Sequence, residues 1–140
     1  MLIAFVVSVC AGTSAFAQER RDGNWWNAQA PEVRPYFIAG MLDGVSLGFM
    51  YTILSPSKDA DGHATEEAKR AADAAVNSFA VAQRKYLLTV KVGQINDGLN
   101  EFYKDFRNRS ILVALGADVV LRQIAGEETD ALILDLRSRK

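Results

Sequence analysis

Cysteine and histidine are almost absent from this chain, which has 140 residues, one cysteine and one histidine. Cys10 lies in an apolar N-terminal stretch, and His63 lies in a polar segment. After residue 17 the chain therefore has no residues for a disulfide, a thiol nucleophile or a thiolate metal site. A Ser-His-Asp triad or a histidine zinc site would depend on His63 alone. We expect no cofactor, no metal and no catalytic residues, and hence no enzyme.

The chain also lacks an excess of charge of either sign. Lys and Arg number 16, Asp and Glu number 17, and the net charge is −1. This balance argues against a nucleic-acid partner. The densest basic cluster, Arg137, Arg139 and Lys140, fits a helix end, where cations suit the helix dipole.

The N-terminus has the order of an export signal. An apolar run, MLIAFVVSVC, is followed by the small residues AGTSAFA and then by the polar QERRDGN. Ala15 and Ala17 occupy the minus-three and minus-one positions of an A-x-A cleavage site, although no Lys or Arg precedes the apolar run. The order predicts a signal peptide over 1–17, a single domain over 18–140, and a periplasmic or secreted protein.

No segment shows the sustained polar–apolar alternation of a strand. Helical periodicity instead predicts four main helices and a short fifth, so the fold class is all-α, a small bundle. The predicted ranges are 36–54, 65–88, 92–107, a fourth helix that ends at Gly126, and 128–137. The third places Val92, Ile95, Leu99, Phe102, Tyr103 and Phe106 in one apolar stripe, and Asp97, Glu101 and Asp105 on a solvated face.

The segment 36–54 is apolar on all sides, which predicts a buried helix. Gly40, Gly44 and Gly48 form a ridge that would let a neighbouring helix approach closely, so a bulky residue at Gly44 should overpack the contact. Asp43 is its single charge. As a buried carboxylate it would be either a structural partner of an arginine or of backbone donors, or a binding-site anion.

A transmembrane interpretation of the same segment is the weaker one. Asp43 would cost about 2.5–3.5 kcal/mol at the middle of a bilayer. Pro35 and Pro56 bracket the run as they bracket helices of soluble proteins. We therefore expect no stable membrane span once the signal is removed.

The stretch SKDADGHATEEA (57–68) partly matches a calcium loop, because Asp59, Asp61 and Gly62 occupy the third, fifth and sixth positions of an EF-hand. The first and twelfth positions, which need carboxylates, hold Ser57 and Ala68. The stretch is therefore interpreted as a polar connection with weak calcium affinity at most.

Trp25 and Trp26 adjoin each other near the predicted mature N-terminus. They fit either of two roles: a staple that closes one end of the helical domain, or anchors that fill pockets of a protein partner.

Three segments carry a resemblance to known proteins: YFIAGMLDGVSLG (36–48), VGQINDGLNEFYKDFRNRSILVALGADVVLRQIAG (92–126) and GNWW (23–26). The first two segments weakly resemble the Tai-type immunity family, periplasmic partners of amidase effectors of type VI secretion. Together the three segments resemble more closely a group of exported proteins with a GNWW-like start. The chain differs from the immunity family in lacking cysteines after residue 17 and in having FRNRS where a His-Pro-type turn is usual.

This resemblance implies a helical fold and a protein-binding, immunity- or inhibitor-like role. The candidate partner-binding residues come from the residues themselves: Trp25 and Trp26 as adjacent tryptophans, and Asp43 as the single charge of an apolar helix. The alternatives are an enzyme with a carboxylate site at Asp43, and an envelope structural or weakly cation-binding protein. The sequence leaves the partner and the oligomeric state open.

Overall fold

A computed structural model describes residues 20–54, 63 and 65–139. Within these residues every regular element is a helix, which confirms the predicted all-α fold. The only pairing of extended backbone in this part is an isolated antiparallel bridge between Asp22 and Leu112. The elements are α1 (Gly23–Ala28), α2 (Arg34–Leu54), α3 (Glu66–Tyr86), α4 (Val92–Phe102), the 3-10 turn η1 (Phe106–Asn108), α5 (Val113–Ile124) and α6 (Asp130–Ser138).

The core lies where α4 packs against α5 and the N-terminal half of α2. The apolar stripe predicted for the third helix supplies its centre, since Ile95, Leu99 and Phe102 are all buried. Trp26 of α1 and Leu136 of α6 complete the same cluster. Helices from both ends of the described chain therefore contribute side chains to one core.

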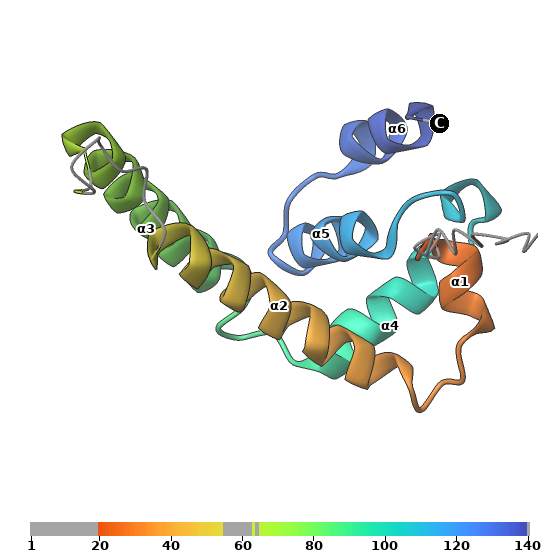
Figure 1. Ribbon diagram of the computed structural model, residues 1–140. Coiled ribbons are helices and arrows are strands. Elements are labelled where there is room, and N and C mark those ends of the chain that lie inside the picture. Colours follow the sequence, from red (N-terminus) through yellow and green to blue (C-terminus); the bar gives the residue numbers. More distant parts are fainter. Residues whose placement is uncertain (1–19, 55–62, 64, 140) are drawn as a thin grey trace, which may run out of the picture.

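The two longest helices, α2 and α3, form a hairpin whose far end projects away from the other helices (Figure 1). Phe49 and Phe79 stack between them with ring centroids 3.9 Å apart. The predicted N-cap of α3 is confirmed, because the Thr65 hydroxyl accepts a hydrogen bond from the Ala68 N–H at 3.1 Å. Residues 1–19, with the predicted signal peptide, and residues 57–62 of the polar connection lie outside the described residues.

The third helix ends earlier than predicted, at Phe102 instead of 107. The reason is a second helical turn with its own cap, because the Asp105 carboxylate accepts a hydrogen bond from the Arg107 N–H at 3.0 Å. The Asn108 side chain also donates to the Phe102 carbonyl at 2.7 Å. As a consequence Phe106, predicted to be in the core, is 74% exposed.

The prediction that α2 is buried on all sides is wrong. Its inner side is buried at Ile38, but its opposite side is exposed along most of its length. Asp43 lies on this exposed side, so it is not a buried carboxylate. Among the described residues, no atom outside the helix stands within 4 Å of the positions that a Cβ would take at Gly40 and Gly44. Within the described residues, no helix therefore packs closely against Gly40 and Gly44, contrary to the prediction.

Candidate protein-binding surface

Trp26 is a core residue. The short helix α1, which the sequence analysis did not predict, begins at Gly23 because the Asp22 carboxylate caps it, accepting from the Asn24 N–H at 2.9 Å and the Trp25 N–H at 3.2 Å. Trp26 is fully buried, and its indole N–H donates to Asn100 Oδ1 at 3.0 Å. Its position favours the staple over the partner anchor.

Trp25 is half-buried and has a different environment. Its ring centroid lies 4.8 Å from that of Phe37 at the start of α2. The Arg21 guanidinium carbon lies 5.7 Å from the Trp25 centroid and 5.4 Å from the Phe37 centroid. These cation–π contacts place the Arg21 charge beside an aromatic pair. Trp25 thus packs against Phe37 beside an exposed cation.

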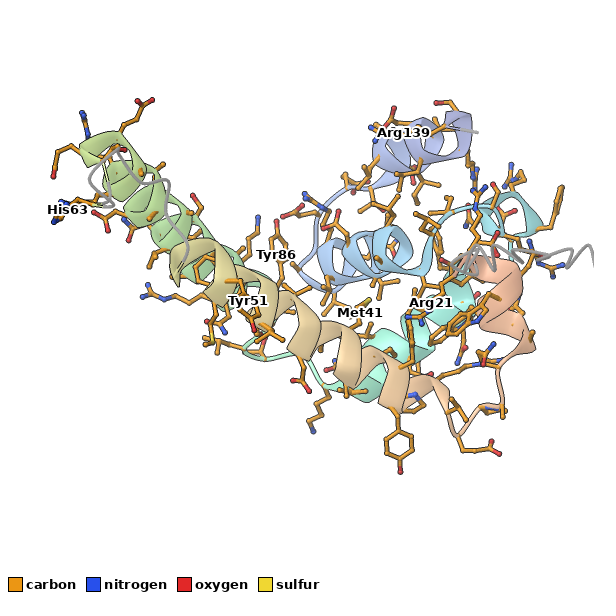
Figure 2. All side chains as sticks on the ribbon, in the orientation of Figure 1. Arg21, Met41, Tyr51, His63, Tyr86 and Arg139 are labelled. Carbon is orange, nitrogen blue, oxygen red and sulfur yellow. The ribbon has the colours of Figure 1, made fainter. Side chains whose placement is uncertain are left out.

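Beside this pair lies a hollow of about 700 Å³, here termed the N-terminal hollow. The Asp22–Leu112 bridge forms it by joining the chain before α1 to the chain before α5, and the Val113 N–H donates to the Arg21 carbonyl at 2.8 Å. Arg21 and Met41 lie on this part of the molecule, and Tyr51 lies farther out along the hairpin (Figure 2). The lining residues are Arg20, Arg21, Tyr36, Phe37, Gly40, Met41, Leu112, Val113 and Ala114.

A second, shallower hollow of about 530 Å³, the central hollow, continues along α2 and shares Gly40 with the first. Its lining residues are Gly40, Asp43, Gly44, Ser46, Leu47 and Met50. We term the exposed side of the helix the α2 face; it comprises Tyr36, Gly40, Asp43, Gly44, Leu47, Met50 and Tyr51.

The α2 face is mainly apolar. Its large side chains are exposed by 80% at Tyr36, 52% at Leu47, 53% at Met50 and 63% at Tyr51. Single exposed apolar residues are ordinary, but a contiguous row of them along one helix marks a surface for binding another molecule. Of the three residues predicted to bind a partner, the structure places only Asp43 on this row.

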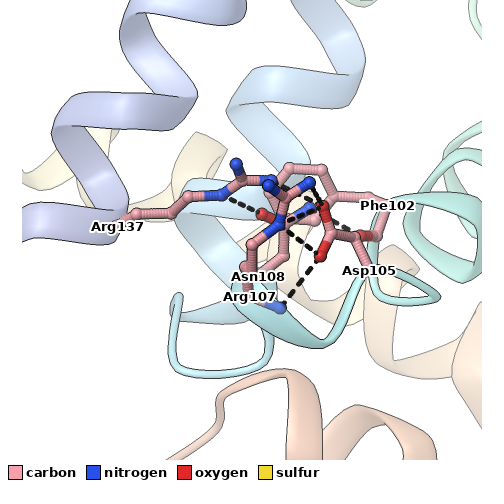
Figure 3. A network of polar contacts seen from close by, with 5 residues as sticks. All are labelled: Phe102, Asp105, Arg107, Asn108 and Arg137. Atoms are coloured by element: carbon pink, nitrogen blue, oxygen red, sulfur yellow. Dashed lines mark hydrogen bonds and ion pairs between the residues drawn. The ribbon is translucent and has the colours of Figure 1, made fainter.

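A polar network fastens α6 to the turn η1 (Figure 3). Arg137 donates to Asn108 Oδ1 and to Asp105 Oδ2, each at 2.8 Å. Hydrogen bonds from the Arg107 side chain and N–H, together with the charge of Arg137, hold the pKa of the Asp105 carboxyl well below its usual value. Asp105, predicted on a solvated face, is therefore partly covered, with its side chain 28% exposed, and its partners give it a structural role.

Glu127 fastens α3 to the segment between α5 and α6. Its carboxylate pairs with Lys85, accepts from the Tyr86 hydroxyl at 2.6 Å and accepts from Arg122 at 3.2 Å. The hydrogen bonds from Lys85 and Tyr86 lower the pKa of Glu127 to about 2. Each donor here already has the carboxylate as its acceptor, so this cluster also has a structural role.

The described residues contain no group of three or more His, Cys, Asp and Glu side chains placed to hold a metal ion. The calcium-like positions 57–62 lie outside the described residues. No helix in the described part is long and apolar enough to cross a membrane.

Comparison with known proteins does not extend these observations: no family model, no curated protein and no solved structure matches the chain.

Sequence reasoning missed the N-terminal hollow. Arg21 and Leu112 are far apart in the sequence, and no periodic pattern of residues indicates that they lie close together in space. The one available signal was Asp22 ahead of GNWW, a capping residue that would have placed α1 and the chain entering it.

Proposed function

We propose that this protein is an exported helical module that acts by binding another protein through the α2 face, in an immunity- or inhibitor-like manner. The observation that carries the proposal is the exposure of this face. A helix that is apolar on every side is normally covered on every side. The uncovered half of α2 is therefore the surface where a partner chain would replace solvent.

The composition of the face also supports a protein partner. Two exposed tyrosines, Tyr36 and Tyr51, combine apolar area with a polar hydroxyl, which is why tyrosine is enriched in protein interfaces. Met50 supplies a flexible apolar side chain that adapts to different contacts. Gly40 and Gly44 add no side chain, so a partner helix can approach the α2 backbone.

The proposed location rests on the N-terminal segment 1–17, whose apolar run and A-x-A site are those of an export signal. Cleavage there would leave Arg20 and Arg21, which line the N-terminal hollow, close to the new N-terminus. The protein would then act as a binding module in the periplasm or outside the cell.

Photo-cross-linking in the native cell tests the proposal. A photoreactive residue replaces Leu47 on the α2 face, and a matched control replaces Leu134 of α6, which is 64% exposed. We expect a discrete protein adduct from position 47 and none from position 134. Equal labelling from both positions, or no adduct from 47 in a folded protein, would contradict a binding role for this face.

A further inference from the structure

Two charges of opposite sign lie on either side of Gly40: Asp43 on the α2 face and Arg21 in the adjoining N-terminal hollow. Arg21 lines the N-terminal hollow and Asp43 lines the central hollow, and the two hollows meet at Gly40. Among the described residues, no group of opposite charge lies within ion-pair distance of Arg21 or Asp43. Arg20, by contrast, already donates to the Ser110 carbonyl at 2.7 Å and lies 3.7 Å from Asp22.

The two sides of Gly40 are also both apolar. The N-terminal hollow is a recess with apolar walls that include Phe37, Met41 and Val113. On the other side, Leu47 and Met50 are apolar side chains that stand half exposed. One side of the face therefore offers a socket, and the other offers side chains of a kind that fill sockets.

We propose that the α2 face pairs with the α2 face of a second copy of this chain, about a two-fold axis that passes between the two Gly40 residues. The axis lies across the line from Arg21 to Asp43, so that the N-terminal hollow of each copy faces the central hollow of the other. Asp43 of one copy then meets Arg21 of its partner, and Leu47 and Met50 enter the partner's socket. The proposal rests on the proposed binding role of the α2 face and names the occupant.

The arrangement of the charges selects a second copy over an unrelated chain. In a two-fold interface every contact occurs twice, so the surface must hold both halves of each contact. The α2 face and the adjoining N-terminal hollow together hold an anion and a cation on opposite sides of Gly40, and half-exposed apolar side chains opposite a recess with apolar walls. Gly40 stands at that point, and with no described atom within 4 Å of its Cβ position it leaves room for the two helices to cross closely.

The stacking of Arg21 on Trp25 and Phe37 prepares it for this role. The aromatic rings contact the guanidinium and restrain its position. A restrained cation loses less side-chain entropy when it binds a carboxylate, and its N–H groups match the two oxygens of Asp43.

The test measures the mass of the full chain in solution by sedimentation equilibrium over a concentration series. We expect a dimer of the wild-type protein. Arg21→Glu and Asp43→Arg should each raise the dissociation constant about tenfold or more, because symmetry removes the pair twice. The double variant Arg21→Glu/Asp43→Arg restores the pair in reverse and should recover most of the affinity. Lys104→Glu, which reverses an exposed cation that follows α4 and lines neither hollow, should leave the dissociation constant unchanged.

Gly40→Leu separates pairing from folding. Its side chain enters open space in the single chain, so the helical circular dichroism and melting temperature of the monomer should be retained. In the dimer the same side chain would stand between the crossing helices, so the variant should sediment as a monomer.

The outcomes distinguish this inference from the proposed function. A monomeric wild-type protein, a dimer unaffected by Gly40→Leu, or a double variant no tighter than the single ones would overturn the pairing. If position 47 then cross-links to a different protein, the binding role of the face survives and the second copy is excluded. If the chain dimerises without any cross-link from position 47, both proposals fail. A cross-link from position 47 between two copies supports the pairing and the binding role of the α2 face, and it contradicts a different protein as the partner at this face.

Discussion

Gly23→Ala should destabilise this protein far more than a single added methyl group usually does. Gly23 is buried at the first position of α1, against the ring of Tyr103 and the backbone of Arg109. A Cβ at this position would stand 2.6 Å from Tyr103 Cε1 and 2.8 Å from Arg109 Cα. Carbon atoms at optimal contact are about 3.5–4.0 Å apart, so one of the neighbours has to move.

Neither neighbour can move without losing other contacts. Tyr103 is fully buried, and its hydroxyl donates to the Ile111 carbonyl at 3.1 Å. The Arg109 carbonyl accepts from the Gly23 N–H at 3.0 Å, so a shift of that backbone breaks a hydrogen bond. Overpacking costs about 1–3 kcal/mol and a broken hydrogen bond about 1 kcal/mol, against a gain of about 0.4–1 kcal/mol from the less flexible unfolded chain. The net loss is about 1–3 kcal/mol, which corresponds to a fall in melting temperature of about 5–15 °C for a domain of this size.

Thermal unfolding followed by circular dichroism measures this loss, with Gly44→Ala as the matched control. Gly44 also lies in a helix, but no described atom outside that helix stands within 4 Å of its Cβ position. Alanine there should raise the stability of the single chain by about 0.5–1 kcal/mol, because glycine is the poorer helix former. Measuring at a concentration where the chain is monomeric excludes any contribution of pairing. The packing argument is refuted if Gly23→Ala melts at the temperature of the wild type or above it.

Three further predictions concern the contacts that join the helices. Trp26→Phe should lower the free energy of unfolding by about 1–3 kcal/mol in urea titration, because it leaves a cavity and removes the donor to Asn100. A smaller change would show that Trp26 contributes little to the stability of the core. Tyr103→Phe should cost about 0.5–1.5 kcal/mol in the same assay, the value of one buried hydrogen bond; no loss would mean that the hydroxyl is dispensable. Because the pKa of Glu127 is lowered by folding from 4.5 to about 2, its contribution to stability is present above pH 4.5 and is lost as the pH falls from about 4.5 to about 2. Glu127→Gln should remove this part of the acid dependence of the melting temperature, and an unchanged profile would show that the carboxylate pairs no better in the folded state than in the unfolded one.

The helices themselves were predictable because their periodicity is local. In α4 the spacing of Ile95, Leu99 and Phe102 specifies which side is buried. Thr65 predicted the start of α3. Gly126 predicted the end of α5, and its positive φ of 79° is the conformation in which a glycine commonly terminates a helix. These signals depend only on residues within a turn or two of each other, so no knowledge of the tertiary structure was needed.

The environment of α2 was not predictable in the same way. Its side chains are apolar in every direction, so periodicity could not say which side the rest of the chain covers. The inference of complete burial assumed that the covering atoms belong to the same chain. That assumption placed Asp43 in a core and gave the glycines an intramolecular neighbour, and both were wrong for the same reason. The position of Arg21 required the bridge between Asp22 and Leu112, a contact between segments with no common pattern.

The glycines of α2 connect stability to binding. Each glycine in a helix costs about 0.5–1 kcal/mol relative to alanine, so Gly40 and Gly44 together cost the single chain about 1–2 kcal/mol. Among the described residues, no close packing at their Cβ positions offsets this cost. If a second copy crosses at Gly40, the offset comes from the interface, where the absence of a side chain allows contact between the helices. Gly40→Ala should therefore change the two measurements in opposite directions, raising the melting temperature of the monomer and weakening the dimer. A glycine without any role in pairing would change the melting temperature alone.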